Sequence, residues 1–432
     1  MNQIKIYKNN LLDKLKKLQT DYYHLFLIVS ASFIVRIVYV FYLNNCKRYL
    51  LTDMDAYWRG ALSLYKGDLF SMFTWAAWPV FFKIYLSFLF KIIAFLGLYK
   101  YLLEVVLVFH VFLSSISVIF FYLICKELIG DKKDSLFATF VYAFSYPLIY
   151  LNIFILTENV AVPFLIISIY LLFRSNSKNS DLLTSGVVFG FVAAIRPSLF
   201  PVFVSFLLYI LFSKKDIVSS LIRSINFSVG FFLIIFLASV QVFYISKGEV
   251  YGLHNSTGAN FFLSQCKYRA LTSTYKEYEF FLGPPLNWKH KEWAEFKTDH
   301  AINDQKYFRN LGLECMKENP HWLKEKFSNL KELFLGNFFP GYESIKYFYP
   351  LMEISKWVML CMFCFIFLLY DPLKKKVLEI NKVLFLISIP FFIIIISFFF
   401  QPELRYLCQA LFAIELLFFL AWIKYVRQNL FK

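Results

Sequence analysis

Two carboxylates stand two residues apart in the first polar segment of the chain. Asp53 and Asp55 follow an apolar run of about twenty residues. A carboxylate in this position can act as a general base that takes the proton from a hydroxyl group. The other interpretation is that both acids favour the start of a helix, with Asp53 as its N-cap, because negative charge stabilises a helix N-terminus. The residues alone leave both interpretations open.

Further charged residues stand at three later turns between apolar runs. Glu158 follows Thr157, Arg196 precedes Pro197, and Arg405 and Tyr406 lie between the last two runs. The structural alternatives are a helix cap at Glu158 and an arginine at Arg196 that reaches for lipid headgroups. If these turns share one face of a membrane, they place carboxylates and guanidinium groups together. Such a set suits a lipid phosphate whose sugar or other headgroup faces outward.

The composition indicates which elements must position these residues. The chain has 432 residues, of which 59% are hydrophobic and 17% charged, and its mean hydropathy is +0.57. This excludes a disordered chain, a small disulfide-rich protein, a collagen and an ordinary cytosolic enzyme. It predicts a polytopic membrane protein. The net charge of +16 is interpreted as lysines that anchor cytoplasmic loops, and not as a nucleic-acid surface.

Eleven apolar runs are candidates for membrane spans. The run 78–97 contains Lys83 and Lys91, which are costly inside a bilayer, so we expect it to lie at the interface and direct both lysines into water or headgroups. The basic loops then put both ends of the chain inside the cell, with about ten spans. The runs are 24–43, 78–97, 103–125, 135–151, 154–173, 183–196, 198–213, 224–246, 353–371, 380–399 and 407–424.

These spans divide the chain into four parts, and the predicted fold class is an all-α polytopic membrane protein. Residues 1–23 form a basic cytoplasmic tail, and 24–246 form a membrane module with a first outer loop at 44–102. Residues 247–350 are too long for an ordinary loop and predict a small, mainly helical outer cap, with helix, turn and helix over 301–334. Residues 351–432 add three spans.

Other chemistries find little support in the sequence. No glycine-rich phosphate loop is present, and the histidines lack the spacing of metal ligands. Cys266 and Cys315 are the two cysteines of the predicted cap, and an oxidising exterior would allow them to form a disulfide.

The order of these motifs is that of a known class. Asp53, Tyr57, Ala61, Leu64 and Gly67 follow a pattern that begins the first outer loop of type C (GT-C) glycosyltransferases. The chain resembles in particular the protein O-mannosyltransferases and the aminoarabinose transferase of lipid A, and its spans before the cap resemble the seven-span module of that class. The other matching segments are Trp78–Lys83, Gly97, 126–130, Tyr146–Pro147, Thr157–Glu158, Ile195–Pro197 and Glu403–Tyr406.

The resemblance implies a hexosyl- or pentosyltransferase that moves a sugar from a polyprenyl phosphate to an acceptor hydroxyl on the outer face, with inversion. Asp53 is the first choice for the base and Asp55 the second. Lys83, Arg196 or Arg405 would stabilise the departing phosphate. Asp55 and Glu158 would orient the substrates or hold a divalent cation, and no other cofactor is expected. Tyr57 and Tyr406 complete the expected substrate site.

Two other functions stay open at this point. One is a flippase or transporter of a lipid-linked sugar, and the other is a polymerase or ligase that uses a diphosphate-linked donor. The acceptor is a lipid, a glycan or a protein. Lysine-, isoleucine- and phenylalanine-rich usage favours a bacterial inner (plasma) membrane, with the active site on the periplasmic side.

Overall fold

The computed structural model describes most of the chain. The residues outside its description are 1–21, 44–49, 51–52, 70–78, 175–178, 214–215, 246–247, 249–251, 254–256, 267–270, 274–278, 283–293, 298–303, 336–348, 367–378, 400–403 and 424–432. The predicted basic tail therefore lies almost entirely outside the described residues.

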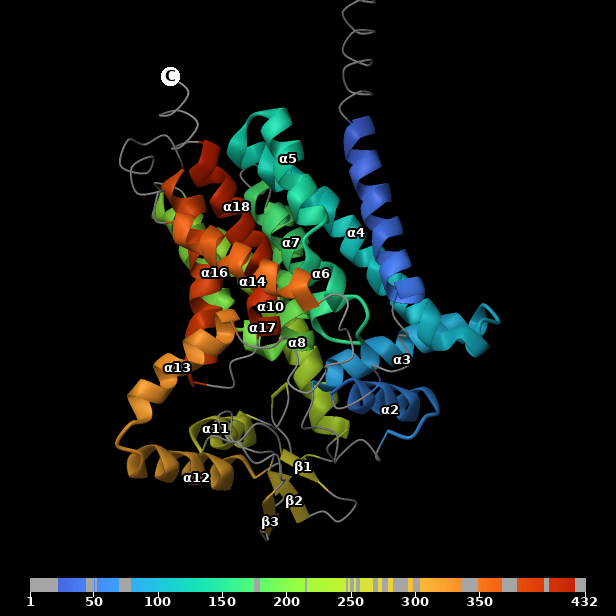
Figure 1. The fold of residues 1–432 in the computed structure, drawn as a ribbon, viewed down its shortest axis with the longest axis vertical. Helices are drawn as coiled ribbons and strands as arrows, with labels where there is room; N and C mark the ends of the chain where they lie inside the picture. Colours follow the sequence, from blue (N-terminus) through green and yellow to red (C-terminus); the bar gives the residue numbers. More distant parts are fainter. Residues whose placement is uncertain are drawn as a thin grey trace, which may run out of the picture.

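A bundle of apolar helices forms the larger part of the molecule (Figure 1). The start of the first helix, the start of α5 and the last part of α18 lie at the upper end of the bundle in this view. The helices are the first helix (Tyr22–Leu43), α4 (Leu102–Ile129), α5 (Lys132–Ala143), α6 (Tyr146–Leu151), α7 (Glu158–Arg174), α8 (Asn179–Ile195), α9 (Val202–Phe212), α10 (Ile217–Ile245), α14 (Tyr349–Phe365), α16 (Ile380–Phe399), α17 (Leu404–Leu407) and α18 (Leu411–Ala421).

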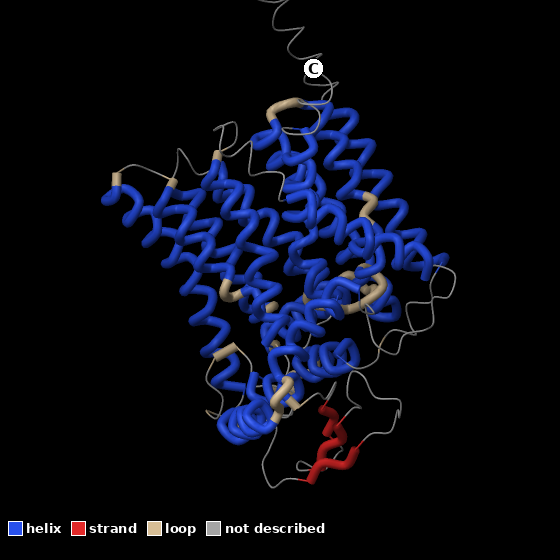
Figure 2. The backbone as a smooth tube through the Cα atoms, turned by 60° about the vertical axis from the view of Figure 1, so that its left-hand side comes forward, coloured by secondary structure: helices blue, strands red, loops and turns tan. Residues whose placement is uncertain are grey.

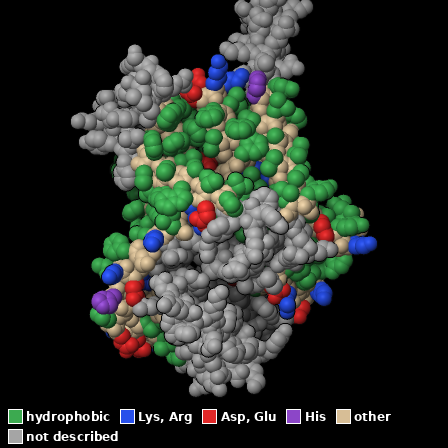
Figure 3. Space-filling view, viewed as in Figure 1, with side chains coloured by type: hydrophobic (Ala, Val, Ile, Leu, Met, Phe, Trp, Pro, Cys, Tyr) green, Lys and Arg blue, Asp and Glu red, His purple; other side chains and the backbone are tan. Residues whose placement is uncertain are grey.

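Four helices of the described part are long and apolar enough to cross a membrane. They are Tyr22–Leu43, Tyr99–Ile129, Ile217–Ile245 and Ile380–Ser397. Three shorter apolar helices accompany them: Asn179–Ile195, Pro197–Phe212 and Cys408–Ala421. Figure 3 shows hydrophobic side chains covering much of the upper half of one face. These features are those of an integral membrane protein, whereas the count of about ten spans stays a prediction.

One predicted span is broken into two helices. The apolar run 135–151 was expected as a single helix, but α5 ends at Ala143 and α6 begins at Tyr146. Pro147 stands in the first turn of α6, where its missing N–H does no harm, while inside a continuous helix it would remove a hydrogen bond.

Two helices lie across the lower end of the bundle. They are α2 (Asp53–Tyr65) and α3 (Val80–Phe95), which pack against each other. The face of α2 that carries Tyr57, Ala61 and Leu64 is buried. The helix α3 is the run 78–97 for which we expected an interfacial position.

The cap lies beyond the lower end of the bundle and is not entirely helical. It contains α11 (Thr257–Gln265), α12 (Gln305–Glu318) and α13 (Trp322–Leu335), which include the predicted helix, turn and helix. It also carries an antiparallel sheet in the order β1-β2-β3, made of Leu271–Ser273, Glu279–Leu282 and Ala294–Lys297. Figure 2 shows the sheet apart from the helices. The prediction of an all-α chain therefore omitted these strands, which are too short to give a clear alternation in the sequence.

Glycines allow two helices to approach closely. A Cβ atom added at Gly186 of α8 would lie 2.1 Å from the carbonyl oxygen of Phe227 in α10, and one at Gly230 would lie 2.3 Å from that of Leu183. Small residues at such positions bring helix backbones together in membranes. Because α8 ends one residue before Arg196, this contact helps to fix the position of that arginine.

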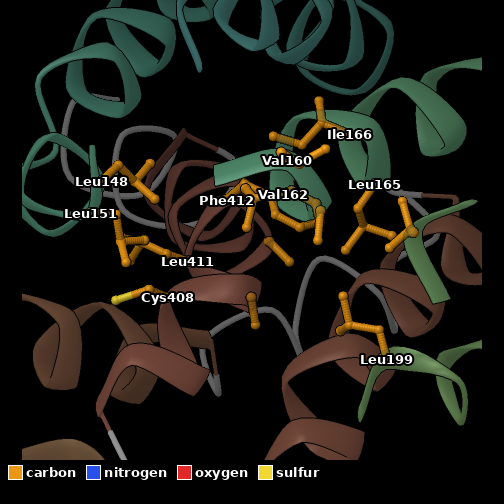
Figure 4. Packing of buried hydrophobic residues seen from close by; sticks show 14 of the residues in the cluster. Leu148, Leu151, Val160, Val162, Leu165, Ile166, Leu199, Cys408, Leu411 and Phe412 are labelled. Carbon is orange, nitrogen blue, oxygen red and sulfur yellow. The ribbon is translucent and has the colours of Figure 1, made fainter. Parts of the chain in front are cut away.

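The core joins the last span to the rest of the bundle. Figure 4 shows Leu148 and Leu151 of α6 and Val160 of α7 near Leu411 and Phe412 of α18. All five side chains are buried. The C-terminal segment is therefore packed into the same core as the predicted membrane module.

Candidate functional site

Two of the predicted site residues form a buried ion pair. Arg196 Nη2 lies 3.2 Å from Glu158 Oε1, and the Glu158 side chain is fully buried. Thr157 joins both residues: its hydroxyl donates to Glu158 Oε2 at 2.8 Å and accepts from Arg196 Nη1 at 3.1 Å. The turn before α7 and the end of α8 are thereby held together by charge and hydrogen bonds.

The C-terminal segment completes this group. The guanidinium carbon of Arg196 lies 4.8 Å from the centre of the Tyr406 ring, a cation–π contact. With the Gln409 amide oriented so that its oxygen faces Arg196, that oxygen accepts from Nε and Nη2, each at 3.0 Å. We call Thr157, Glu158, Arg196, Tyr406 and Gln409 the Arg196 cluster. The sequence analysis missed Gln409, although an amide three residues after Tyr406 in an apolar run was a signal.

Side-chain hydrogen bonds hold the turn that precedes Glu158. The side-chain amide of Asn159 donates to the carbonyl oxygens of Leu151, at 2.9 Å, and Phe154, at 2.7 Å. Asn152 in turn donates to the Asn159 side-chain oxygen at 2.9 Å. These bonds satisfy backbone groups that a turn among apolar side chains would otherwise leave unpaired. The location of α6 therefore determines where Glu158 lies.

The first-loop acids lie on a different element. Asp53 and Asp55 occupy the first turn of α2, where their charge favours the helix N-terminus. Asp55 accepts a hydrogen bond from Arg59 Nε at 2.7 Å, and both side chains are partly exposed. Tyr57 is buried, with its ring 4.9 Å from that of Phe82 in α3.

The start of α3 lies between α2 and α8. Phe82 contacts Tyr57 on one side, and Phe81 contacts Phe191 of α8 on the other, at a ring distance of 5.7 Å. Lys83 stands at this point of α3 and is fully buried. The expectation that both lysines of this helix reach water or headgroups is therefore wrong for Lys83, because neighbouring elements cover it, while Lys91 is exposed. Burial lowers the pKa of the Lys83 ammonium group, and a nearby anion would favour its charged form.

Three of the remaining residues singled out in the sequence cannot be placed. The side chain of Arg405, which lies on α17, is outside the described residues, and so are Glu403 and Trp78. Within the described part of the chain, no three His, Cys, Asp or Glu side chains gather as a metal-ion site. Asp55 and Glu158, the carboxylates that could hold a divalent cation, are instead each paired with an arginine.

The two cap cysteines are joined. Cys266 follows α11 and forms a disulfide with Cys315 of α12, with a Cα–Cα distance of 5.3 Å. Two further contacts attach α13 to α11: Trp322 Nε1 donates to Gln265 Oε1 at 2.7 Å, and Lys326 Nζ donates to the Ser264 carbonyl oxygen at 3.0 Å. The helices of the cap therefore form one unit.

The helical bundle, with a polar cluster at the ends of its helices, is that of an integral membrane protein. Residues 86–244 match the family model described as dolichyl-phosphate-mannose-protein mannosyltransferase. This match confirms the resemblance of the chain to membrane glycosyltransferases of the protein mannosyltransferase type, and it covers 159 of the 432 residues. No curated protein and no solved structure matches the chain.

The matched segment contains only part of the candidate site. Glu158 and Arg196 lie within residues 86–244. Asp53, Lys83 and Tyr406 lie outside them, and so does Gln409. The contacts of Arg196 with Tyr406 and Gln409 therefore connect the segment matched by the family model with a part of the chain that it does not cover.

Proposed function

We propose that this protein transfers a sugar from a polyprenyl-phosphate donor to an acceptor hydroxyl group on the outer face of the membrane. The Arg196 cluster is the observation that carries the proposal, because it gathers an ion pair and three uncharged polar side chains from three separate segments of the apolar bundle. The matching family is that of dolichyl-phosphate-mannose-protein mannosyltransferases, whose donor is a sugar on a lipid phosphate. Here we assign only the donor class, and the acceptor is a lipid, a glycan or a protein.

The proposed reaction is a single displacement. Asp53 takes the proton of the acceptor hydroxyl while that oxygen forms a bond to the anomeric carbon. The bond between this carbon and the phosphate oxygen breaks, and the phosphate leaves with the electron pair. A phosphate departs without a general acid, so one carboxylate suffices where a glycosidase uses two. The configuration at the anomeric carbon inverts.

The contacts divide the cations into two roles. Arg196 already donates to Thr157 and Gln409 and is paired with Glu158, so we assign it mainly to holding Glu158 and Tyr406 beside the substrate. Lys83, which is buried between α2 and α8, is our first choice for stabilising the charge on the departing phosphate. Arg405 is the second. Asp55, Tyr57, Glu158 and Tyr406 would orient the sugar or the acceptor.

The test is sugar transfer by protein in liposomes that hold synthetic polyprenyl-phosphate sugars and an acceptor extract. Asp53→Asn should fold as the wild type does and lose turnover by a factor of about 100 to 10,000, the usual contribution of a general base. Asp55→Asn, which changes the second candidate for the base, is measured beside it. Wild-type turnover in Asp53→Asn would refute the assignment of the base, and a loss in Asp55→Asn alone would move the base to Asp55.

The same liposomes separate the other functions. Transfer from diphosphate-linked but not monophosphate-linked donors would indicate the polymerase or ligase. Movement of labelled lipid across the bilayer without a new glycosidic bond would indicate the flippase.

A further inference from the structure

The break between α5 and α6 lies among buried side chains. α5 ends at Ala143 and α6 begins at Tyr146, and Tyr142, Ala143 and Leu148 around the break are buried. The end of a helix leaves carbonyl groups without partners, and the start of the next leaves N–H groups. In the apolar interior of a membrane protein, other side chains must satisfy these groups.

A buried arginine from the first helix meets the end of α5. Arg36 has no exposed surface, and its Nη1 atom donates to the Ala143 carbonyl oxygen at 2.7 Å. The same nitrogen donates to the Ser32 hydroxyl and carbonyl oxygens, and the Ser32 hydroxyl also donates to Ala143 O at 3.4 Å. A positive charge at this end of a helix is favourable, because the helix dipole is negative there.

A buried carboxylic acid from the last span meets the break on its other side. Glu415 of α18 is buried and hydrogen-bonds with Ser145, the residue directly before α6. Tyr142, in the last turn of α5, interacts electrostatically with both Arg36 and Glu415, and its hydroxyl lies 3.0 Å from that of Ser117 in α4. The two ionisable side chains therefore approach the same break from opposite ends of the sequence.

Arg36 and Glu415 make their hydrogen bonds with residues close to the break. In the described part of the chain, Arg36 Nε and Nη2 and Glu415 Oε2 have no hydrogen-bond partner. The partners that they do have are Ser32, Ala143 and Ser145. A buried ionisable group is costly unless it is compensated. The presence of two such groups at one break is accounted for if they hold the break in one geometry.

A short series of contacts connects the α5–α6 break to the Arg196 cluster. α6 follows the break directly and ends at Leu151, whose carbonyl oxygen accepts from Asn159. Asn159 is the neighbour of Glu158, which is paired with Arg196. Each step is a hydrogen bond, an ion pair or a covalent connection of one or two residues.

We propose that Arg36 and Glu415 are positioning residues, which hold the α5–α6 break so that Glu158 meets Arg196. The inference rests on the proposed function, because its kinetic readout is sugar transfer. Neither residue lies in the segment 86–244 that the family model matches. Neither touches the Arg196 cluster in the contacts described above.

The experiment compares Arg36→Leu and Glu415→Leu with the conservative variants Arg36→Lys and Glu415→Gln. In each, Cys46, Cys361 and Cys364 are changed to serine, so that Cys125 and Cys408 are the remaining free thiols, both buried. Cys408 is the neighbour of Gln409, so its reaction with a membrane-permeant maleimide reports on the packing of the Arg196 cluster. Transfer kinetics and thermal unfolding are measured on the same preparations.

We expect Arg36→Leu and Glu415→Leu to lower kcat by roughly tenfold to a hundredfold per folded molecule, the effect of a small misplacement of catalytic groups. Cys408 should react faster in both. Arg36→Lys and Glu415→Gln should keep intermediate rates, because each retains a group that can bond to the break. The double Leu variant should lose less than the product of the two single losses, since both act on one break.

Arg223→Leu is the matched control, because it removes a buried arginine of α10. We expect it to lower thermal stability without changing kcat or the reactivity of Cys408. Wild-type kcat and thiol reactivity in folded Arg36→Leu would overturn the proposal. If Arg36→Leu does not fold, wild-type kcat and wild-type thiol reactivity in both Arg36→Lys and Glu415→Gln would overturn the proposal. If the wild type transfers no sugar, the thiol reaction still decides whether the two residues hold the break.

Discussion

At the scale of single residues, Arg196 is the side chain on which the candidate site depends most. Its guanidinium group reaches Glu158 and Thr157 on one side and Tyr406 and Gln409 on the other. Such planar, multiply bonded recognition is a property of arginine that lysine does not share. The role of Arg196 can therefore be tested through stability as well as through activity.

We expect Arg196→Gln to lower the free energy of unfolding by about 3–5 kcal/mol, because it leaves the buried Glu158 carboxylate without its counter-charge. The double variant Arg196→Gln/Glu158→Gln should be more stable than Arg196→Gln alone, since neither charge then remains. Denaturant unfolding in detergent measures both. A double variant less stable than either single variant would show that the pair is not coupled in this way.

The residues of the site were predicted to different degrees. Glu158, Arg196 and Tyr406 could be proposed because each is a polar residue at a turn between apolar runs. Polar and ionisable side chains are costly in a membrane, so their presence there indicates a functional site. The sequence could not show that they meet, because that depends on the packing of α7, α8 and α17. Glu415 was missed because a single acid within an apolar run shows no partner until the fold brings Ser145 beside it.

At the scale of helices, glycines bring the backbones of α8 and α10 close together. We expect Gly186→Ala to lower the free energy of unfolding by about 1–3 kcal/mol, because its methyl group would collide with the Phe227 carbonyl oxygen. Sugar transfer should fall as well, since α8 leads directly to Arg196. Thr184→Ala, at an exposed position of the same helix, is the control. Thermal unfolding of Gly186→Ala at the wild-type temperature would contradict the close packing.

The stability of the cap should depend on pH, because Lys326 of α13 is bonded to Ser264 of α11. Burial lowers the pKa of Lys326 from 10.5 to about 8. Between these values the unfolded cap binds more protons than the folded cap, so stability should rise as pH increases through this range. Thermal unfolding at several pH values between about 7 and 10 measures the slope, and Lys326→Met should have a smaller one. An equal slope in both proteins would exclude Lys326 as its source.

The helices themselves were largely predictable, and their interruptions were not. Apolar periodicity and length located the bundle helices and the α12–α13 pair, because long apolar segments have few alternatives in a membrane. The break after Ala143 was missed although Pro147 signalled it. The burial of Lys83 could not be predicted, because it follows from the packing of α2 and α8 around the start of α3.

At the scale of the whole molecule, an ion pair at the other end of the bundle joins the C-terminal segment to the module. Lys382 of α16 lies 2.7 Å from Glu127 of α4 and 5.5 Å from the centre of the Phe173 ring. Asn381 donates to the Phe212 carbonyl oxygen at 2.7 Å. The C-terminal segment is thus attached at both ends, by Lys382 here and by Tyr406 and Gln409 at the candidate site.

We expect Lys382→Glu to lower the free energy of unfolding by about 2 kcal/mol, between the values of exposed and fully buried pairs. Adding Glu127→Lys should recover part of the loss, because the pair is restored with exchanged charges. Thermal unfolding of the single and double variants gives the comparison. No recovery in the double variant would mean that the Glu127 contact contributes little.

The contacts of Arg196 with Tyr406 and Gln409 also have a consequence for biosynthesis. The ribosome makes Glu158 and Arg196 more than two hundred residues before Gln409, and a nascent chain that has inserted every earlier helix still lacks two members of the cluster. Assembly of the site therefore has to wait for insertion of the final span. A chain that stalls or is cut before that point carries the segment recognised by the family model but holds an incomplete Arg196 cluster.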